Sequence, residues 1–185
     1  MKIFHFHFGK EGGAERFFVS LINSFAERGV EQVAFIRPDR LWRGEIDSRI
    51  EVHERTWRRI SLTRFFIEAK LKRMIKERRP DALMAWMPRG ARLTPNYPDA
   101  IKVARLGDYP LRLDYFTNID VLVCNTPGIA ERVRELGWKR RVEVISNFTT
   151  IQTAPPISRE SVNTPANAFV VLGVGRFVRR KGFHT

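Results

Sequence analysis

The spacing of apolar positions changes twice within the first forty residues. Residues 2–8 are mostly apolar and aromatic, without glycine or proline, which predicts a strand. After a glycine-rich loop, apolar side chains recur at helical spacing, at Phe17, Phe18, Leu21, Ile22 and Phe25. This spacing predicts a helix from about Ala14 to Arg28, closed by Gly29. Residues 32–36 then predict a second strand, so the order indicates a βαβ unit.

Strands and helices continue to alternate as far as residue 145. Short apolar runs predict further strands at 49–53, 82–86, 101–106, 121–124 and 142–145. Helices are expected at 61–79, at 110–116 and from Pro127 to Gly137, with Thr126 as the N-cap of the last. Residues 39–48 are polar and are expected to be irregular. The pattern predicts an α/β fold, a Rossmann-like parallel sheet with flanking helices.

The character of the chain changes near residue 150. Residues 151–167 are rich in Thr, Pro, Ser and Asn and predict a linker. Residues 169–174 are again apolar and predict a buried strand. We therefore expect a domain at 1–150, a linker at 151–167, and the first strand and loop of a second domain at 168–185.

The composition is that of a globular protein, with 43% hydrophobic and 29% charged residues. No apolar stretch approaches the roughly 18–20 residues that span a bilayer, and the N-terminus lacks the pattern of a signal peptide. The single cysteine, Cys124, lies in an apolar run and is expected to be buried. These features favour a cytoplasmic protein.

The charge narrows the choice of partners. Thirty-three Lys and Arg residues against 20 Asp and Glu give a net charge of +13, which favours binding to nucleic acid, phospholipid headgroups or a phosphorylated substrate. Residues 54–79 alone hold ten basic and three acidic residues. That stretch is interpreted as a solvated helix face, as a surface that docks on an anionic membrane, or as a nucleic-acid surface.

Gly12 and Gly13 lie between the first strand and the first helix. Glycines allow backbone N–H groups to approach an anion, and a helix N-terminus favours negative charge. The alternative is a tight turn that needs glycine for its backbone conformation. The segment is not a P-loop, because no Gly-Lys-Ser/Thr follows.

A second glycine turn follows the apolar run at 169–174. Its sequence, "GVGRFVRRKG", fails the dinucleotide pattern because Val178 occupies the third glycine position. Arg176 and Lys181 are candidates to clamp a diphosphate. The alternative is a solvated basic loop.

Polar residues also follow two of the central predicted strands. Ligands of open parallel sheets bind beyond the carboxyl ends of the strands. Trp86 is a candidate to stack on a sugar, Arg89 and Arg105 are candidates to hold an anion, and Asp108 is a candidate to accept hydrogen bonds from hydroxyls. The alternative is that these are ordinary polar loop residues without a binding role.

Metal and serine-hydrolase chemistry are not expected. His5 and His7 fall on one side of the first strand, but nothing at metal-ligand spacing accompanies them. The sequence has no Gly-x-Ser-x-Gly motif. We therefore predict no metal site and no cofactor.

Four segments together resemble a known family. They are "GGAERFFVSLINSFAERGVEQV", "RPDALMAW", "IDVLVCNTPGIAERVRELGWKRRVEVISNF" and "VLGVGRFVRRKGFHT". In this order they resemble the N-terminal half of a GT-B glycosyltransferase of family 4, the "group 1" retaining enzymes. The third segment is most similar to branches that build lipopolysaccharide core or other cell-surface glycans. The resemblance spans nearly the whole chain.

The resemblance implies a role for each segment. The first domain would bind the acceptor, and the last segment would open a second domain for the nucleotide sugar. Gly12, Gly13, Arg176 and Lys181 would lie near the donor diphosphate, and the two basic residues would neutralise charge on the departing nucleotide. Asn147 would lie near the interdomain cleft. The family commonly places a His after the middle strand; here Asp108 is the substitute.

The resemblance also implies partners and a location. We expect a nucleotide-sugar donor as substrate, an anionic glycan or lipid-linked acceptor, and an anionic membrane surface, with the protein peripheral on the inner face of the cytoplasmic membrane. The chain would be a fragment without turnover of its own. Two alternatives remain: a basic α/β protein that binds nucleic acid or another anion without catalysis, and a stand-alone binding domain that ends naturally at Thr185.

Overall fold

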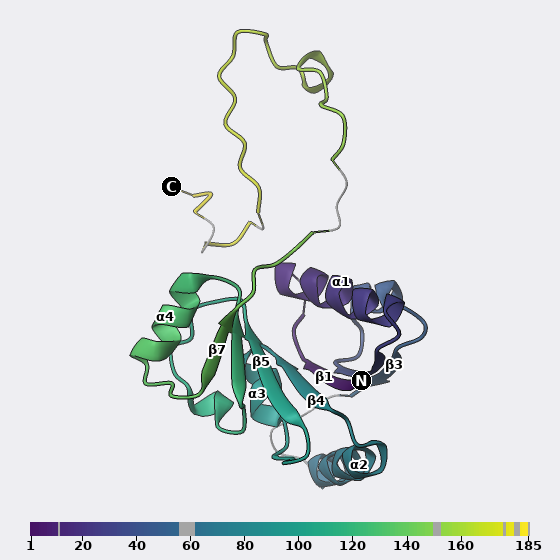
Figure 1. The fold of residues 1–185 in the computed structure, drawn as a ribbon. Coiled ribbons are helices and arrows are strands. Elements are labelled where there is room, and N and C mark those ends of the chain that lie inside the picture. Colours follow the sequence, from purple (N-terminus) through teal and green to yellow (C-terminus); the bar gives the residue numbers. More distant parts are fainter. Residues whose placement is uncertain (11, 56–61, 150–152, 176, 180–181, 185) are drawn as a thin grey trace. The chain divides into compact units, whose positions relative to one another are not determined.

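The computed structural model describes residues 1–10, 12–55, 62–149, 153–175, 177–179 and 182–184. The chain divides into two compact units, Met1–Thr150 and Ile151–Thr185. Figure 1 shows helices and a sheet in the first unit, and mostly irregular chain in the second.

The first unit is built on one seven-stranded sheet in the order β3-β2-β1-β4-β5-β6-β7, and all six neighbouring pairs are parallel. Its strands are β1 (Lys2–His7), β2 (Glu31–Ile36), β3 (Glu51–Glu54), β4 (Ala82–Trp86), β5 (Ile101–Leu106), β6 (Val121–Cys124) and β7 (Arg141–Val144). Its helices are α1 (Gly13–Glu27), α2 (Leu62–Arg78), α3 (Met87–Leu93) and α4 (Pro127–Glu135). The predicted Rossmann-like α/β fold is confirmed.

The strand order reverses direction at the centre of the sheet. β1 pairs with β2 on one side and with β4 on the other. The crossovers on the two sides therefore leave a crevice beyond the carboxyl ends of β1 and β4. This is the place where ligands of open α/β sheets bind.

Helices cover both faces of the sheet. Successive side chains of β1 point to opposite faces: Phe4 and Phe6 pack in one cluster with Leu71 of α2, whereas His5 and His7 lie against Phe18 of α1. A further cluster joins α3 and α4 to β5 and β6. The result is a three-layer α/β/α unit.

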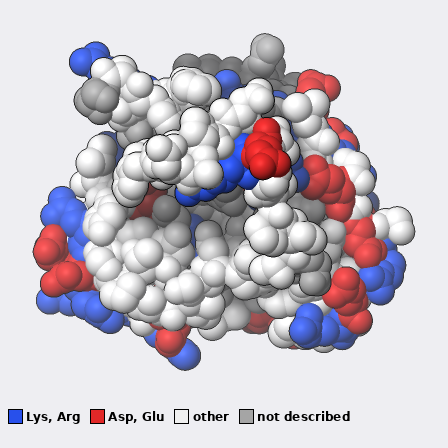
Figure 2. All heavy atoms as spheres, turned by 90° about the horizontal axis from the view of Figure 1, so that it is seen from above, with Lys and Arg blue, Asp and Glu red and all other residues white. Residues whose placement is uncertain are grey.

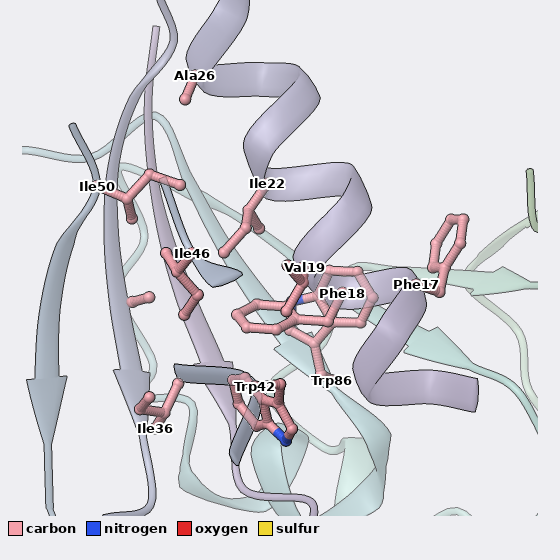
Figure 3. Packing of buried hydrophobic residues seen from close by; sticks show 11 residues of the cluster. Phe17, Phe18, Val19, Ile22, Ala26, Ile36, Trp42, Ile46, Ile50 and Trp86 are labelled. Atoms are coloured by element: carbon pink, nitrogen blue, oxygen red, sulfur yellow. The ribbon is translucent and has the colours of Figure 1, made fainter. Parts of the chain in front are cut away.

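The packing of α1 shows why its sequence forms this helix. Phe18, Val19 and Ile22 point from α1 toward the sheet, and the rings of Trp42 and Trp86 lie beside Phe18 (Figure 3). These residues are all buried. The apolar stripe seen in the sequence is thus the face that α1 buries.

In the first unit most predicted elements agree with the structure to within about two residues, but three regions differ. The segment after Trp86 is the short helix α3 and not a loop; at seven residues it is too short for helical periodicity to reveal. Within residues 110–116 only the 3₁₀ turn η2 (Asp114–Phe116) forms, and residues 39–48 hold the 3₁₀ turn η1 (Leu41–Glu45).

The close approach of α3 to β1 depends on one glycine. A Cβ at Gly90 would lie 2.4 Å from the carbonyl oxygen of Phe6. No side chain fits there, so Gly90 lets α3, which starts directly after β4, pack against the backbone of β1 near its carboxyl end. This places α3 at the central crevice.

In the second unit, the predicted strand at 169–174 is not formed. The segment has no strand assignment, and Phe169 is 92% exposed and Leu172 is 83% exposed. A strand needs neighbours to pair its backbone and cover its side chains, and the described residues supply none for this segment. The described residues of the second unit include the 3₁₀ turn η3 (Glu160–Val162). The assignment of 168–185 to a second domain stays a prediction.

Candidate functional site

The glycine loop lies at the N-terminus of α1, beyond the carboxyl end of β1. Gly12 is the N-cap, and its φ of 151° lies in a region that favours glycine. Gly13 is different, because its φ is not positive and a Cβ there would meet no described atom within 4 Å. Neither strain nor crowding among the described residues explains a glycine at position 13. Close approach of a ligand to the backbone would explain it.

Beneath this loop lies a buried pair, His7 and Glu15. Gly9 donates its backbone N–H to Nδ1 of His7 over 3.3 Å. The Nε2 of His7 is buried without a hydrogen-bond partner and lies 4.0 Å from Oε1 of Glu15. Burial lowers the pKa of His7 to about 3, so the ring is neutral at pH 7. The pair supports the loop from below, and no sequence pattern indicated a role for Glu15.

Trp86 belongs to a buried chain of hydrogen bonds. Its Nε1 donates to Nδ1 of His5 over 3.4 Å, and Nε2 of His5 bonds to Oε1 of Gln32 over 3.0 Å. Burial lowers the pKa of His5 to about 4. Trp86 is only 3% exposed. Its ring therefore packs in the core and offers no exposed surface for a sugar in this structure, because its side of β4 is the side that α1 covers.

Arg105 and Asn147, predicted separately, are in direct contact. One terminal nitrogen of Arg105 donates to Oδ1 of Asn147, and the other donates to the carbonyl of Ile145 over 3.1 Å. The guanidinium also lies 4.3 Å from the ring centroid of Phe17. Phe17 in turn contacts Phe148 at 5.1 Å between centroids. Arg105 thus holds the segment after β7 against α1.

The charge environment of Arg105 fits this holding role. Burial lowers the pKa of its guanidinium, and no carboxylate of the described residues forms an ion pair with it. Its donors are used by a carbonyl and an amide. Arg105 therefore serves mainly as a structural contact within the protein, rather than as an open anion-binding site.

The other predicted site residues are scattered. Arg89 is exposed on α3, at the central crevice, and Asp108 is exposed after β5, where its carboxylate accepts from the N–H of Tyr109 over 3.0 Å. Arg176 and Lys181 lie outside the described residues. The structure therefore brings together the glycine loop and Arg89 at the carboxyl ends of β1 and β4, and Arg105 with Asn147 beside them.

Charge is distributed around the molecule. On the face shown in Figure 2, Lys and Arg alternate with Asp and Glu around the edge of the view and form no single basic field. A pocket of about 840 Å³ opens at the opposite edge of the sheet, where Asp81 and Asp99 precede β4 and β5. Lys72 and Lys76 of α2 line it, together with Arg79, which follows that helix. This pocket is remote from the crevice.

The described residues contain neither a membrane-spanning helix nor a cluster of metal ligands. None of their helices is long and apolar enough to cross a membrane. None of their His, Cys, Asp and Glu side chains form a group of three or more that could hold a metal ion.

The family model of Glycosyltransferase Family 4 matches residues 11–152. Two curated relatives come from Rhizobium meliloti (strain 1021). The lipopolysaccharide core biosynthesis glycosyltransferase LpsE is 57% identical over 185 residues, which are 100% of this chain and 54% of the relative. LpsD, of the same description, is 54% identical over 183 residues, which are 99% of this chain and 53% of the relative. The chain spans about half the length of these relatives.

Solved structures show the same fold at lower identity. A glycosyltransferase from Rickettsia africae ESF-5 matches with a TM-score of 0.62 and 17% identity, over 78% of this chain and 42% of that one. The lipopolysaccharide outer core galactosyltransferase WaaB matches with a TM-score of 0.56 and 19% identity, over 86% of this chain and 50% of that one. The family match covers most of the first unit, including Gly12, Gly13 and the six strands from β2 to β7. The chain belongs to glycosyltransferase family 4.

Proposed function

We propose that this chain is part of a retaining glycosyltransferase that moves a sugar from a nucleotide-sugar donor to a glycan or lipid-linked acceptor, in the synthesis of lipopolysaccharide or another cell-surface polysaccharide. The observation that carries this proposal is the 57% identity over the whole chain with a lipopolysaccharide core glycosyltransferase. Family membership does not favour the alternative of a noncatalytic nucleic-acid-binding protein.

The glycine loop is the proposed contact for the donor diphosphate. Backbone N–H groups at the start of α1 are free of intrahelical partners, and the helix dipole favours a negative group there. Gly13 is exposed and has open space around its Cα. A glycine at a helical position costs up to about 1 kcal/mol relative to alanine. Close approach of a phosphate would account for a glycine that the described neighbours do not require.

The remaining assignments follow from the resemblance and from position. Arg176 and Lys181 would neutralise the charge that develops on the departing nucleotide diphosphate. Asp108 is the proposed group facing the transferred sugar. Asn147 would line the acceptor side of the cleft, and Arg105 would fix its position through their direct contact. The donor phosphate would itself act as the base, and the proposal includes no metal or cofactor held by this chain.

The proposed location is the cytoplasm, peripheral on the inner face of the cytoplasmic membrane. The excess of basic residues, +13 in total, would attract the protein to anionic lipid or to an anionic acceptor. We further expect that the 185-residue chain alone transfers no sugar, because it spans only about half the length of the glycosyltransferases that it matches.

Substitutions at two glycines, Gly13 and Gly44, test whether the glycine loop contacts the donor diphosphate. In the complete gene product, Gly13→Ala should lower transfer to the lipopolysaccharide acceptor by about 10²-fold, because the added methyl displaces the donor phosphate from the backbone. The unfolding midpoint should not fall, since no described atom meets the new Cβ. Transfer would be followed with radiolabelled nucleotide sugars.

Gly44→Ala is the matched control. Gly44 is also exposed, lies in η1, and has nothing within 4 Å of an added Cβ. It should transfer sugar at the wild-type rate. Equal activity of the Gly13 and Gly44 variants would remove the phosphate assignment, and a wild-type protein that transfers no sugar from any nucleotide donor would remove the proposed function.

A further inference from the structure

Three arginines surround the end of β1. Arg37 directly follows β2, Arg40 lies three residues later, and Arg89 lies on α3, directly after β4. Since β1 is between β2 and β4 in the sheet, the three side chains come from both sides of its carboxyl end. They therefore stand at the central crevice, next to the glycine loop, in the place where open α/β sheets bind ligands.

Arg37 is the most informative of the three. It is partly buried, and no described residue gives it a hydrogen bond or an ion pair. Burial and the like charges of Arg89 and Arg40 lower the pKa of its guanidinium. Arg37 is thus close enough to both Arg89 and Arg40 to be repelled by their charges.

The acids near this cluster do not neutralise Arg37. Asp39 is exposed and forms no ion pair in the described structure. Arg40 uses its Nε to donate to the carbonyl of Pro38 over 2.9 Å, which leaves its terminal nitrogens for another acceptor. Elsewhere arginines are matched by acids, as in the pairs Arg49–Asp47, Arg73–Glu77 and Arg132–Glu135.

A partly buried cation such as Arg37, which no described acid neutralises, costs folding free energy, and it is retained at sites where a ligand supplies the opposite charge. Arginine is suited to this task because its planar fork donates two parallel hydrogen bonds to phosphate or carboxylate. We propose that Arg37, Arg40 and Arg89 bind an oxyanion, a phosphate or carboxylate group that is carried by a sugar substrate. This inference rests on the proposed function and adds a second anion site beside the glycine loop.

Two substrates could carry the oxyanion: the donor, through its diphosphate, or the acceptor, through a phosphate or acidic sugar. Both have the same chemistry at this site. Kinetics on the complete gene product separates them, because a lost contact raises the KM for the substrate that made it.

The first experiment measures binding by the 185-residue chain. Inorganic phosphate would be titrated while the Nε–Hε signals of the arginine side chains are recorded by NMR, with chloride at matched ionic strength as the reference. Arg37, Arg40 and Arg89 should shift together, and Arg37→Gln with Arg40→Gln should weaken binding at least about fivefold. Arg132→Gln with Arg134→Gln, which removes the same number of charges from α4, should bind as the wild type does.

The second experiment measures steady-state transfer by the complete gene product. Arg37→Gln with Arg40→Gln should raise the KM for either the acceptor or the donor at least about fivefold. A raised acceptor KM identifies an anionic acceptor, and a raised donor KM identifies the diphosphate. Should the double variant unfold, Arg89→Gln, an exposed position, replaces it.

The outcomes separate the two proposals. An active enzyme whose KM values are unchanged in the variants, or phosphate binding that ignores the substitutions, would overturn the arginine site and leave the transferase. A wild-type protein that binds phosphate through these arginines but transfers no sugar would overturn the proposed function instead.

Discussion

β6 and residues 169–174 are similar as sequences and different as structures. "VLVC" at 121–124 and "FVVLGV" at 169–174 are both short apolar runs that predict buried strands. In β6, Leu122 and Cys124 are fully buried between β5 and β7. In the second run, Phe169 and Leu172 are exposed and no strand forms.

The difference shows that an apolar run specifies a strand only where partners exist. β6 has a hydrogen-bonded neighbour on each side and α4 above it, with Ile129 and Val133 in the same cluster as Leu122. The described residues offer the second run no such neighbour. Burial, and therefore stabilisation by the hydrophobic effect, depends on these partners as well as on the run itself.

The largest expected effect comes from matched truncations in the two runs. Leu122→Ala should destabilise the chain by about 3 kcal/mol, because it leaves a cavity in a packed core. Leu172→Ala, at a side chain that is 83% exposed, should change stability by less than about 0.5 kcal/mol. Urea unfolding followed by circular dichroism gives both values. Equal losses would mean that residues 169–174 are packed in solution, and the comparison would fail.

A smaller effect should follow acidification to pH 5.5, where the free energy of unfolding should fall by about 2 kcal/mol in all. Burial holds the pKa of His5 at about 4 and that of His7 at about 3, below the ordinary value of 6.5. The unfolded chain therefore takes up protons below pH 6.5 that the folded chain does not. Stability is complete above that pH and falls as the pH falls toward the folded values. Each histidine should account for about 1 kcal/mol by pH 5.5.

The nearby Glu15 favours a protonated His7, but at 4.0 Å it accepts no hydrogen bond from the ring, and burial is the larger influence. Added salt serves as the control, because it screens repulsion among the exposed basic residues while leaving the buried histidines unaffected. Urea midpoints at pH 7 and pH 5.5 that agree at high salt would refute the histidine contribution and leave general charge repulsion as the cause of acid sensitivity.

The sequence was a good guide to the frame of the first unit. Strand ends, the glycine loop and the Thr126 cap follow from local patterns, and the rule that ligands bind beyond parallel strands singled out Arg89, which lies on α3 directly after β4. The same rule misjudged Trp86, because it does not say which side of the strand a helix covers. It also could not foresee that Arg105 holds Asn147, or that the charge of Arg89 acts on Arg37, since both pairs consist of residues far apart in the chain.

The smallest expected effect comes from removing a capping side chain, at Thr126 in the first unit or at Ser158 in the second. Oγ1 of Thr126 accepts the backbone N–H of Ile129 at the start of α4 over 3.4 Å, and Oγ of Ser158 accepts that of Ser161 at η3 over 3.2 Å. Thr126→Ala should cost about 1 kcal/mol, because α4 packs on the sheet and its loss weakens the whole unit. Ser158→Ala should leave the urea midpoint unchanged, since the exposed turn that it caps is coupled to no core. A comparable loss at both positions would show that the second unit unfolds together with the first, and it would require packing for residues 153–175 that their exposure in this structure does not show.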